Sequence, residues 1–366
     1  MKFRGKSILV ILLVLAIFAT TAACGGGGAS PSAGASASAS ASASTTPDKV
    51  YELNVNMTFI EENGPGASAA IKNCEERSGG RLKFTTYWGN TLLNIMEIPK
   101  GISDGIADIS LLPLNMYEDQ LPLNSLLSQP FMGFKDSEHA LRVVYQMLDE
   151  FPQLSQEFLD LGMTPTGWYP LPPYQLHLVS GTKQVRVPED LRGEKIITSK
   201  VELSTFLATV NCAAINQPIT ELYSSLEKGV ANGVVQMGAV LSGFNLLPLL
   251  NQHVFIGPTG THLDFCVMVI RTATLESMPE DLQQILIEEW TTSAIGQQEQ
   301  ERKQAEINYA EQTAAGKPIV TITDEELLQW SEPLQPINEA SVAAMAQRLP
   351  VATEIAARIR ELIASS

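Results

Sequence analysis

Histidines are the residues of this sequence best suited to act as general bases or to bind a metal ion. The chain contains four of them, at His139, His177, His253 and His262, and their spacing matches no set of metal ligands. We therefore interpret each as an ordinary surface or core histidine and predict no metal site. One catalytic alternative stays open, a secreted hydrolase that uses His177 or His262. It would need a serine or cysteine that the histidine activates.

Other catalytic signatures are absent from the sequence. It has no G-x-S-x-G turn for a nucleophilic serine, no Walker phosphate loop, and no G-x-G-x-x-G between a strand and a helix. Adjacent acidic pairs such as Glu288 with Glu289 fall on expected helices, where neighbouring side chains point apart. We interpret them as solvated faces and not as acid and base partners. The sequence predicts neither an enzyme nor a cofactor.

Cysteines indicate no metal site and no disulfide framework. Cys74, Cys212 and Cys266 lie far apart in apolar or helical stretches, without the spacing of zinc ligands. An odd count leaves at least one thiol free, and burial as a small hydrophobic group is the favoured interpretation. Whether two of them form a disulfide in an oxidising compartment stays open.

The N-terminus has the pattern of an export signal. Lys2, Arg4 and Lys6 precede twelve unbroken apolar residues at 8–19, a run shorter than the about 20 residues that a membrane-spanning helix needs. Small residues then lead into Cys24, as in the bacterial lipobox. We predict a lipoprotein signal peptide at 1–23 and lipid attachment at Cys24. The alternative is an uncleaved anchor with an incidental cysteine.

Residues 24–47 are Gly, Ala, Ser, Thr and Pro after the cysteine, so we predict a flexible tether that cannot bury apolar surface. Cleavage of the signal would remove three positive charges and take the formal net charge from −16 to −19. An acidic chain repels phosphate backbones, and no nucleic-acid partner is predicted. The 45% hydrophobic composition is that of a globular protein.

Hydrophobic periodicity predicts an α/β fold. Alternating residues near 53–57 and 82–86 indicate two strands, helices are expected through 70–74 and 95–102, and a short buried strand is expected at 109–112. A second α/β unit follows later in the chain. From Pro279 onward long helices are expected, and Thr323 with Glu326 forms a capping box. Such alternation favours a largely parallel sheet with helices on both faces.

Several short motifs also occur in the order found in the solute-binding proteins of TRAP transporters, the tripartite ATP-independent periplasmic systems. The chain resembles this family from about Leu53 to Leu349. The motifs are Ser-Gly-Gly-Arg at 78–81, Gly-Asn-Thr-Leu at 89–92, Ser-Asp-Gly at 103–105, Gln-Pro-Phe at 129–131, the stretch 187–196, Glu-Leu-Tyr-Ser-Ser-Leu at 221–226, Gly-Val-Ala-Asn-Gly at 229–233, Thr-His at 261–262, and Met-Pro-Glu-Asp-Leu-Gln at 278–283.

The resemblance implies a two-lobed periplasmic-binding-protein-like fold, with each lobe a mixed sheet flanked by helices and a ligand cleft between the lobes. Lobe one would comprise 48–174 and 264–302, and lobe two 175–263 and 303–366. It further implies an extracytoplasmic protein that captures a small organic solute and delivers it to the integral-membrane permease subunits of a TRAP transporter. The membrane would be reached through the N-terminal lipid only.

The expected ligand site departs from the family pattern. The arginine that normally binds the ligand carboxylate falls on Ile197, which offers neither charge nor donors. A second family arginine falls on His177, an amide on Gln236 and an aromatic residue on Ile219. We expect these four residues to face the cleft from lobe two. A more apolar pocket follows, suited to a bulky or monocarboxylic organic acid or to a neutral ligand, and not to a simple dicarboxylate.

Trp88 and Asn115 are expected to face the cleft from lobe one, and Pro113 occupies a loop position where the family can place a polar contact. Trp168 and Tyr169, at the crossing between lobes, could line the pocket or pack as a hinge. Ile197 and Ile219 could instead be core residues if the alignment is shifted by one residue. In that case Arg192, Lys195 or Lys200 could supply the missing charge. A scaffold lipoprotein without a small ligand is a further alternative, and a closed, dry interface between the lobes would favour it.

Overall fold

The computed structural model describes residues 49–59, 61, 64–181 and 183–365. The predicted signal peptide, Cys24 and the tether lie outside these residues. The chain divides at Pro47, and Asp48–Ser366 forms a compact unit of its own with its own hydrophobic core. None of the helices in the described part is long and apolar enough to span a bilayer.

The first sheet has five strands in the order β2-β1-β3-β10-β4. They are β1 (Tyr51–Asn56), β2 (Leu82–Tyr87), β3 (Ile109–Pro113), β4 (Met163–Pro170) and β10 (Phe265–Arg271). β1 runs parallel to β2 and β3, while β10 runs antiparallel to β3 and β4, so the sheet is mixed. The predicted alternation is confirmed: α1 (Pro65–Arg77) separates β1 from β2, and α2 (Ile98–Ser103) separates β2 from β3.

The second sheet has six strands in the order β11-β9-β5-β8-β6-β7. They are β5 (Tyr174–Leu178), β6 (Lys195–Ile197), β7 (Ala213–Ile215), β8 (Gly233–Met237), β9 (Gln252–Phe255) and β11 (Ile319–Thr321). β5 is antiparallel to both β8 and β9, whereas β6 is parallel to β7 and β8. Its helices include α6 (Val201–Thr209), α7 (Leu222–Glu227) and α10 (Asp324–Ser331). The predicted capping box, in which Thr323 and Glu326 bond each other's backbone, is confirmed at the start of α10.

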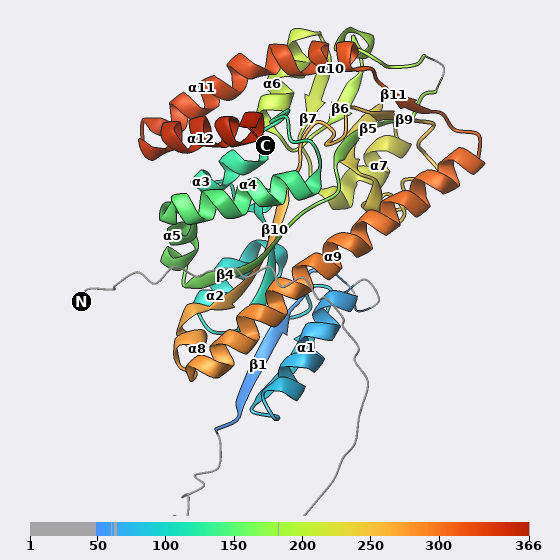
Figure 1. Ribbon diagram of the computed structural model, residues 1–366. Helices are drawn as coiled ribbons and strands as arrows, with labels where there is room; N and C mark the ends of the chain where they lie inside the picture. The colour runs from blue at the N-terminus through green and yellow to red at the C-terminus, as the bar shows by residue number, and fades with distance from the viewer. Residues whose placement is uncertain (1–48, 60, 62–63, 182, 366) are drawn as a thin grey trace, which may run out of the picture. The chain divides into compact units, whose positions relative to one another are not determined.

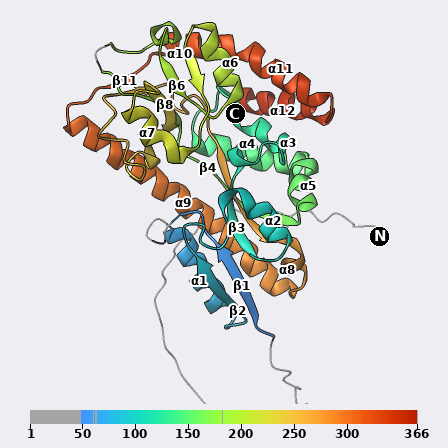
Figure 2. The same ribbon diagram turned by 180° about the vertical axis from the view of Figure 1, so that it is seen from behind.

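The long helix α9 (Glu280–Ala314) extends along both sheets, as Figures 1 and 2 show. It contacts α1 and β4 on the side of the first sheet and the turn Gly238–Val240 on the side of the second. Glycines permit the close approach at both places. A Cβ on Gly66 would lie 2.5 Å from the Ser293 carbonyl oxygen, and one on Gly238 would lie 2.5 Å from the ring of Tyr309.

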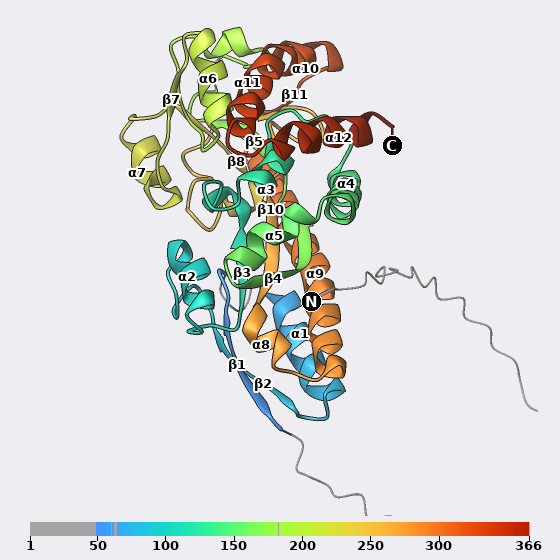
Figure 3. The same ribbon diagram turned by 90° about the vertical axis from the view of Figure 1, so that its left-hand side faces the viewer.

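Helices in the middle and at the end of the chain pack together. Those not yet named are α3 (Pro122–Ser125), α4 (Ser137–Glu150), α5 (Pro152–Asp160), α8 (Thr272–Glu276), α11 (Gln335–Ala346) and α12 (Val351–Ser365). Figure 3 shows α12 beside α4. Ile359 of α12 shares a buried cluster with Val144 of α4. The C-terminal helix, expected in lobe two, therefore contacts a helix expected in lobe one.

The three cysteines of the described part are buried, as the sequence favoured, and no disulfide joins any two of them.

Candidate functional site

Two segments cross between the sheets side by side. Residues 171–173 connect β4 to β5, and 256–264 connect β9 to β10. The Leu171 amide donates to the Asp264 carbonyl over 2.8 Å, and the Thr261 amide donates to the Tyr174 carbonyl over 2.8 Å. These backbone bonds fix the two crossings to each other, so side chains on both have defined positions between the sheets.

A buried ammonium group joins this crossing to both sheets. Lys200 stands at the N-terminal end of α6, on the side of the second sheet, and only 3% of its side chain is exposed. Its Nζ lies 2.9 Å from Oδ1 of Asp264, a fully buried residue directly before β10. The same Nζ donates to Oε1 of Glu118 over 2.7 Å, and Glu118 follows β3 of the first sheet.

Both buried groups of this cluster are charged at neutral pH. Burial disfavours the ammonium, but the charges of Asp264 and Glu118 outweigh it and raise the pKa of Lys200 above its usual range. Burial also disfavours the Asp264 carboxylate. Lys200 and His262 outweigh that effect and hold the pKa of Asp264 well below its usual range. The site therefore contains one ammonium and two carboxylates.

His262 extends the cluster along the crossing. Its ring stacks on Tyr174 with 4.3 Å between centroids, its Nδ1 lies 2.9 Å from Oγ1 of Thr261, and its Nε2 lies 3.6 Å from Oδ2 of Asp264. The order of hydroxyl, imidazole and carboxylate is that of a hydrolase triad. The Thr261 hydroxyl, however, is fully buried and also bonds the Tyr174 carbonyl over 3.2 Å. A buried hydroxyl that cannot reach a substrate cannot attack that substrate as a nucleophile.

His177 is also fully enclosed in protein. Its Nε2 lies 3.0 Å from the Gln236 carbonyl and its Nδ1 lies 2.9 Å from Nδ1 of His253. A carbonyl only accepts, so Nε2 of neutral His177 carries the proton and His253 donates to His177. Burial, followed by the charge of His253, lowers the pKa of His177 to about 3. Burial lowers that of His253 to about 4, so both rings are neutral at pH 7.

Ile197 and Gln236, also expected from lobe two, lie on the same face of the second sheet as His177. His177 and Ile197 both pair with Val234, and Gln236 lies two residues further along the same strand. Ile197 is 3% exposed within a hydrophobic cluster, and Ile219 is half-buried against that cluster. The Gln236 amide oxygen accepts from the Met237 backbone over 2.8 Å.

Trp168 and Tyr169 pack in the interior. The Trp168 ring meets Phe158 edge to face with 5.7 Å between centroids. Tyr169 is fully buried, and its hydroxyl donates to Oε1 of Glu301 on α9 over 3.4 Å. Hinge packing stays a prediction for both residues. A ligand contact stays a prediction for either.

Trp88 and Asn115 lie on the side of the first sheet. Trp88 follows β2, is half-buried, and would lie 2.6 Å from a Cβ on Gly64. Asn115 stands three residues before Glu118, and its Oδ1 is buried without a hydrogen-bond partner among the described residues. This oxygen could accept a hydrogen bond from a solute.

Sequence reasoning missed Glu118 and Asp264 and named Lys200 only as an alternative. Asp264 did carry a signal, because it is the only charged residue in the apolar run from Leu263 to Ile270. A charge in such a run is buried and requires a partner of opposite sign.

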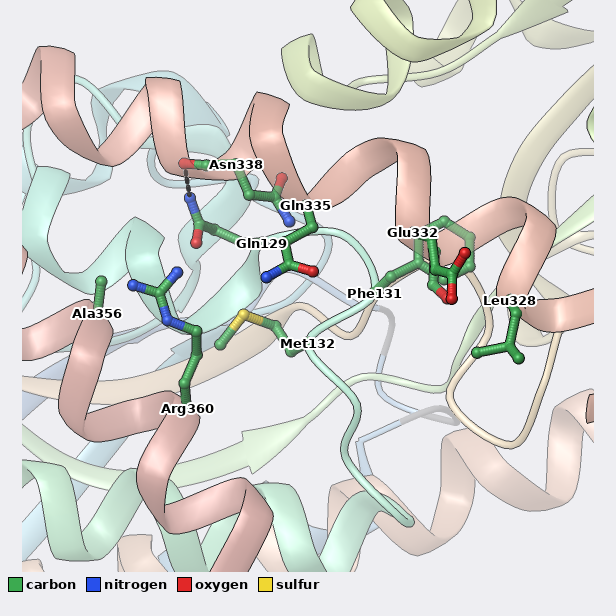
Figure 4. A pocket seen from close by; sticks show the side chains of 10 residues that line it. Gln129, Phe131, Met132, Leu328, Glu332, Gln335, Asn338, Ala356 and Arg360 are labelled. Carbon is green, nitrogen blue, oxygen red and sulfur yellow. Dashed lines mark hydrogen bonds between the residues drawn. The ribbon is translucent and has the colours of Figure 1, made fainter.

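A separate pocket of about 340 Å³ lies between the loop after residue 128 and the C-terminal helices, as Figure 4 shows. Phe131 in this loop has a positive φ of 53°. None of the residues predicted to bind ligand lines the pocket. Its lining residues are Gln129, Phe131, Met132, Leu328, Ser331, Glu332, Gln335, Asn338, Ala356 and Arg360.

Comparison with known proteins gives a family match over most of the chain. The model of the family "Bacterial extracellular solute-binding protein, family 7" matches residues 63–344. A protein of Albidiferax ferrireducens named "Solute-binding protein" is 21% identical over 266 residues, which are 70% of this chain and 75% of that protein. Another of that name, from Verminephrobacter eiseniae, is 22% identical over 50% of this chain and 53% of its own length.

Solved structures share the fold. A TRAP solute-binding protein from Rhodoferax ferrireducens with copurified benzoate has a TM-score of 0.75 and 19% identity, covering 86% of this chain and 98% of that one. A marine metagenome protein specific for aromatic acids, with 3-hydroxybenzoate, has a TM-score of 0.74 and 15% identity, covering 86% and 98%. One from Roseobacter denitrificans with β-D-glucuronate has a TM-score of 0.70 and 18% identity, covering 86% and 100%.

Proposed function

Since this chain belongs to the bacterial extracellular solute-binding proteins of family 7, the solute-binding proteins of TRAP transporters, we propose that it captures a small organic acid outside the cytoplasm and delivers it to a TRAP permease. The match over residues 63–344 carries this proposal. The fold supports it, because two mixed sheets joined by two adjacent crossings suit a hinge between lobes that close on a ligand.

The proposed solute has one carboxylate and a substantial apolar part. Ile197 stands where the family has an arginine, Ile219 stands where it has an aromatic residue, and both contact aliphatic side chains. Benzoate and 3-hydroxybenzoate occupy two proteins of the same fold, and each is a monocarboxylate with an apolar ring. A short dicarboxylate would require a second cation that this face does not offer.

We propose lipid attachment at Cys24, with 24–47 as the tether. Metabolic labelling with palmitate in a bacterial host tests this directly. The wild-type chain is expected to incorporate label and to sediment with membranes. Cys24→Ser should incorporate no label, whereas a wild-type chain without label, or equal label in both chains, would contradict lipid attachment at Cys24.

A thermal-shift screen of Asp48–Ser366 tests solute binding, because a ligand that binds only the folded state raises the melting temperature. At a hundredfold excess over Kd the stabilisation is about 2.7 kcal/mol, or roughly 5 °C for a unit of this size. The panel should hold benzoate, 3-hydroxybenzoate, glucuronate, short dicarboxylates, amino acids and neutral solutes.

Shifts confined to monocarboxylates support the proposal. A selective shift with a short dicarboxylate would contradict the apolar pocket. No shift with any solute would favour the scaffold alternative over the binding function.

A further inference from the structure

Among the lysines and arginines that the structure describes, Lys200 is the only buried residue. Arg192 and Lys195, the other cations near Ile197 in sequence, are exposed. A carboxylate enclosed between the sheets would lose its hydration and would need a cation that is enclosed with it. Lys200 meets that requirement, because its side chain is enclosed and its Nζ already contacts two carboxylates, those of Asp264 and Glu118.

We propose that Lys200 binds the carboxylate of the solute and that Glu118 is the internal counter-ion which this carboxylate displaces. The inference rests on the proposed solute-binding function and adds to it an anchor and an exchange step. In the absence of solute, Glu118 occupies the position on Lys200 that the solute carboxylate takes when it binds.

The two carboxylates on Lys200 are unequal, and the difference identifies the one that leaves. Asp264 is fully buried and fixed by the crossing, since its backbone carbonyl accepts from Leu171. The Glu118 side chain is 39% exposed, and its one described ion pair is with Lys200. Released Glu118 regains water at little cost, whereas released Asp264 would remain a buried, unpaired charge. Glu118 is therefore the exchangeable partner.

The exchange also selects for charge. One solute carboxylate in place of Glu118 leaves the balance around Lys200 unchanged, with one ammonium facing two carboxylates. A second solute carboxylate would be a third negative charge near Asp264 without a new cation, and like charges in a site of low dielectric repel strongly. The site thus favours monocarboxylates through its charge count, independently of its apolar wall.

Isothermal titration of Asp48–Ser366 with benzoate, 3-hydroxybenzoate and D-glucuronate tests the exchange. Glu118→Gln keeps the shape of the side chain and removes the competing charge, so at least one of these acids should bind about tenfold more tightly. Lys200→Gln should weaken the same acid by about a hundredfold. Arg192→Gln and Lys195→Gln are matched controls and should stay within about twofold of the wild type.

Unchanged or weaker binding by Glu118→Gln overturns the exchange. A loss of less than about tenfold in folded Lys200→Gln overturns the anchor. If Lys200→Gln does not fold, the Glu118→Gln result decides alone, because that side chain is partly exposed. Binding of neutral solutes only, with no response to any of the three acids, refutes this inference and leaves solute binding intact. Absence of all solute binding refutes the proposed function itself.

Discussion

Lys200→Met should destabilise the folded unit strongly, because it removes the cation from a buried ion pair. Coulomb's law with an effective dielectric constant of about 20 gives roughly 6 kcal/mol for opposite unit charges at the observed 2.9 Å from Asp264, before the cost of desolvation. Removing one partner of a buried pair costs about 3–5 kcal/mol, since the other charge stays buried without compensation. We expect the free energy of unfolding at pH 7 to fall by this amount.

Urea denaturation of Asp48–Ser366, followed by circular dichroism, measures the change. Glu118→Gln is the matched control. Its carboxylate is 39% exposed, so loss of that contact should cost about 1 kcal/mol or less, and the pair of Lys200 with Asp264 remains. The difference between the two variants separates the buried contact from the exposed one.

Acidification gives a second, independent signature. In the wild type the depressed pKa of Asp264 contributes stability that is present above its unfolded pKa, near 4, and is lost only below it. In Lys200→Met the buried carboxyl should have a raised pKa, so the folded state binds a proton that the unfolded chain releases. The deficit of the variant should then shrink as the pH falls from 7 to 5. A deficit below about 1 kcal/mol at pH 7, or one that does not shrink on acidification, would refute the reasoning.

Further predictions concern three other features of the unit. Burial raises the pKa of Glu301 to about 7, so the folded state retains a proton that the unfolded chain loses above about pH 4.5. The free energy of unfolding of the wild type therefore falls as the pH rises toward 7. In urea denaturation, the free energy of unfolding of Glu301→Gln relative to that of the wild type should rise by about 2 kcal/mol from pH 5.5 to pH 8. Gly260→Ala should lower the free energy of unfolding by more than about 3 kcal/mol, because φ is +66° and the new Cβ would lie 2.2 Å from the Tyr174 carbonyl oxygen. Gly316 has a similar φ of +74° but no atom within 4 Å of its Cβ position, so Gly316→Ala should lower it by only about 1 kcal/mol in the same assay. Burial raises the pKa of the Cys74 thiol to about 12, so this thiol should react with a disulfide reagent at pH 8 far more slowly in the native unit than after unfolding.

The fold followed from local pattern to a large extent. The sequence predicted β1 and β2 from the alternation of apolar and polar residues around Leu53 and Phe84, and the end of α1 from the glycines at 79–80. Both signals are local, because they depend only on neighbouring residues. The position of α12 did not follow. Its apolar face predicts burial but does not say against which partner, and Ile359 packs against α4 across more than two hundred residues of sequence.

The site was less predictable than the fold. His177, Ile197 and Gln236 do share one face of the second sheet, which register along β5, β6 and β8 brings about, and Ile219 packs against the cluster that contains Ile197. The charged cluster at the crossing was not foreseen as a unit. Lys200, Glu118 and Asp264 are far apart in sequence and carry no common motif, and only the tertiary arrangement of both sheets brings them together.

Replacement of an arginine by a lysine as anchor changes how such a site selects its solute. A guanidinium fork fixes the orientation of a carboxylate through two parallel hydrogen bonds, whereas an ammonium is a point charge on a flexible stem that imposes little orientation. Under the proposed exchange, Lys200 therefore supplies the affinity for one carboxylate without fixing the orientation of the rest of the solute. Selection by shape must then come from the rigid apolar side of the site. Ile197, held in a cluster with Leu222 and Val234, is suited to that role because a packed wall rejects groups that do not fit it.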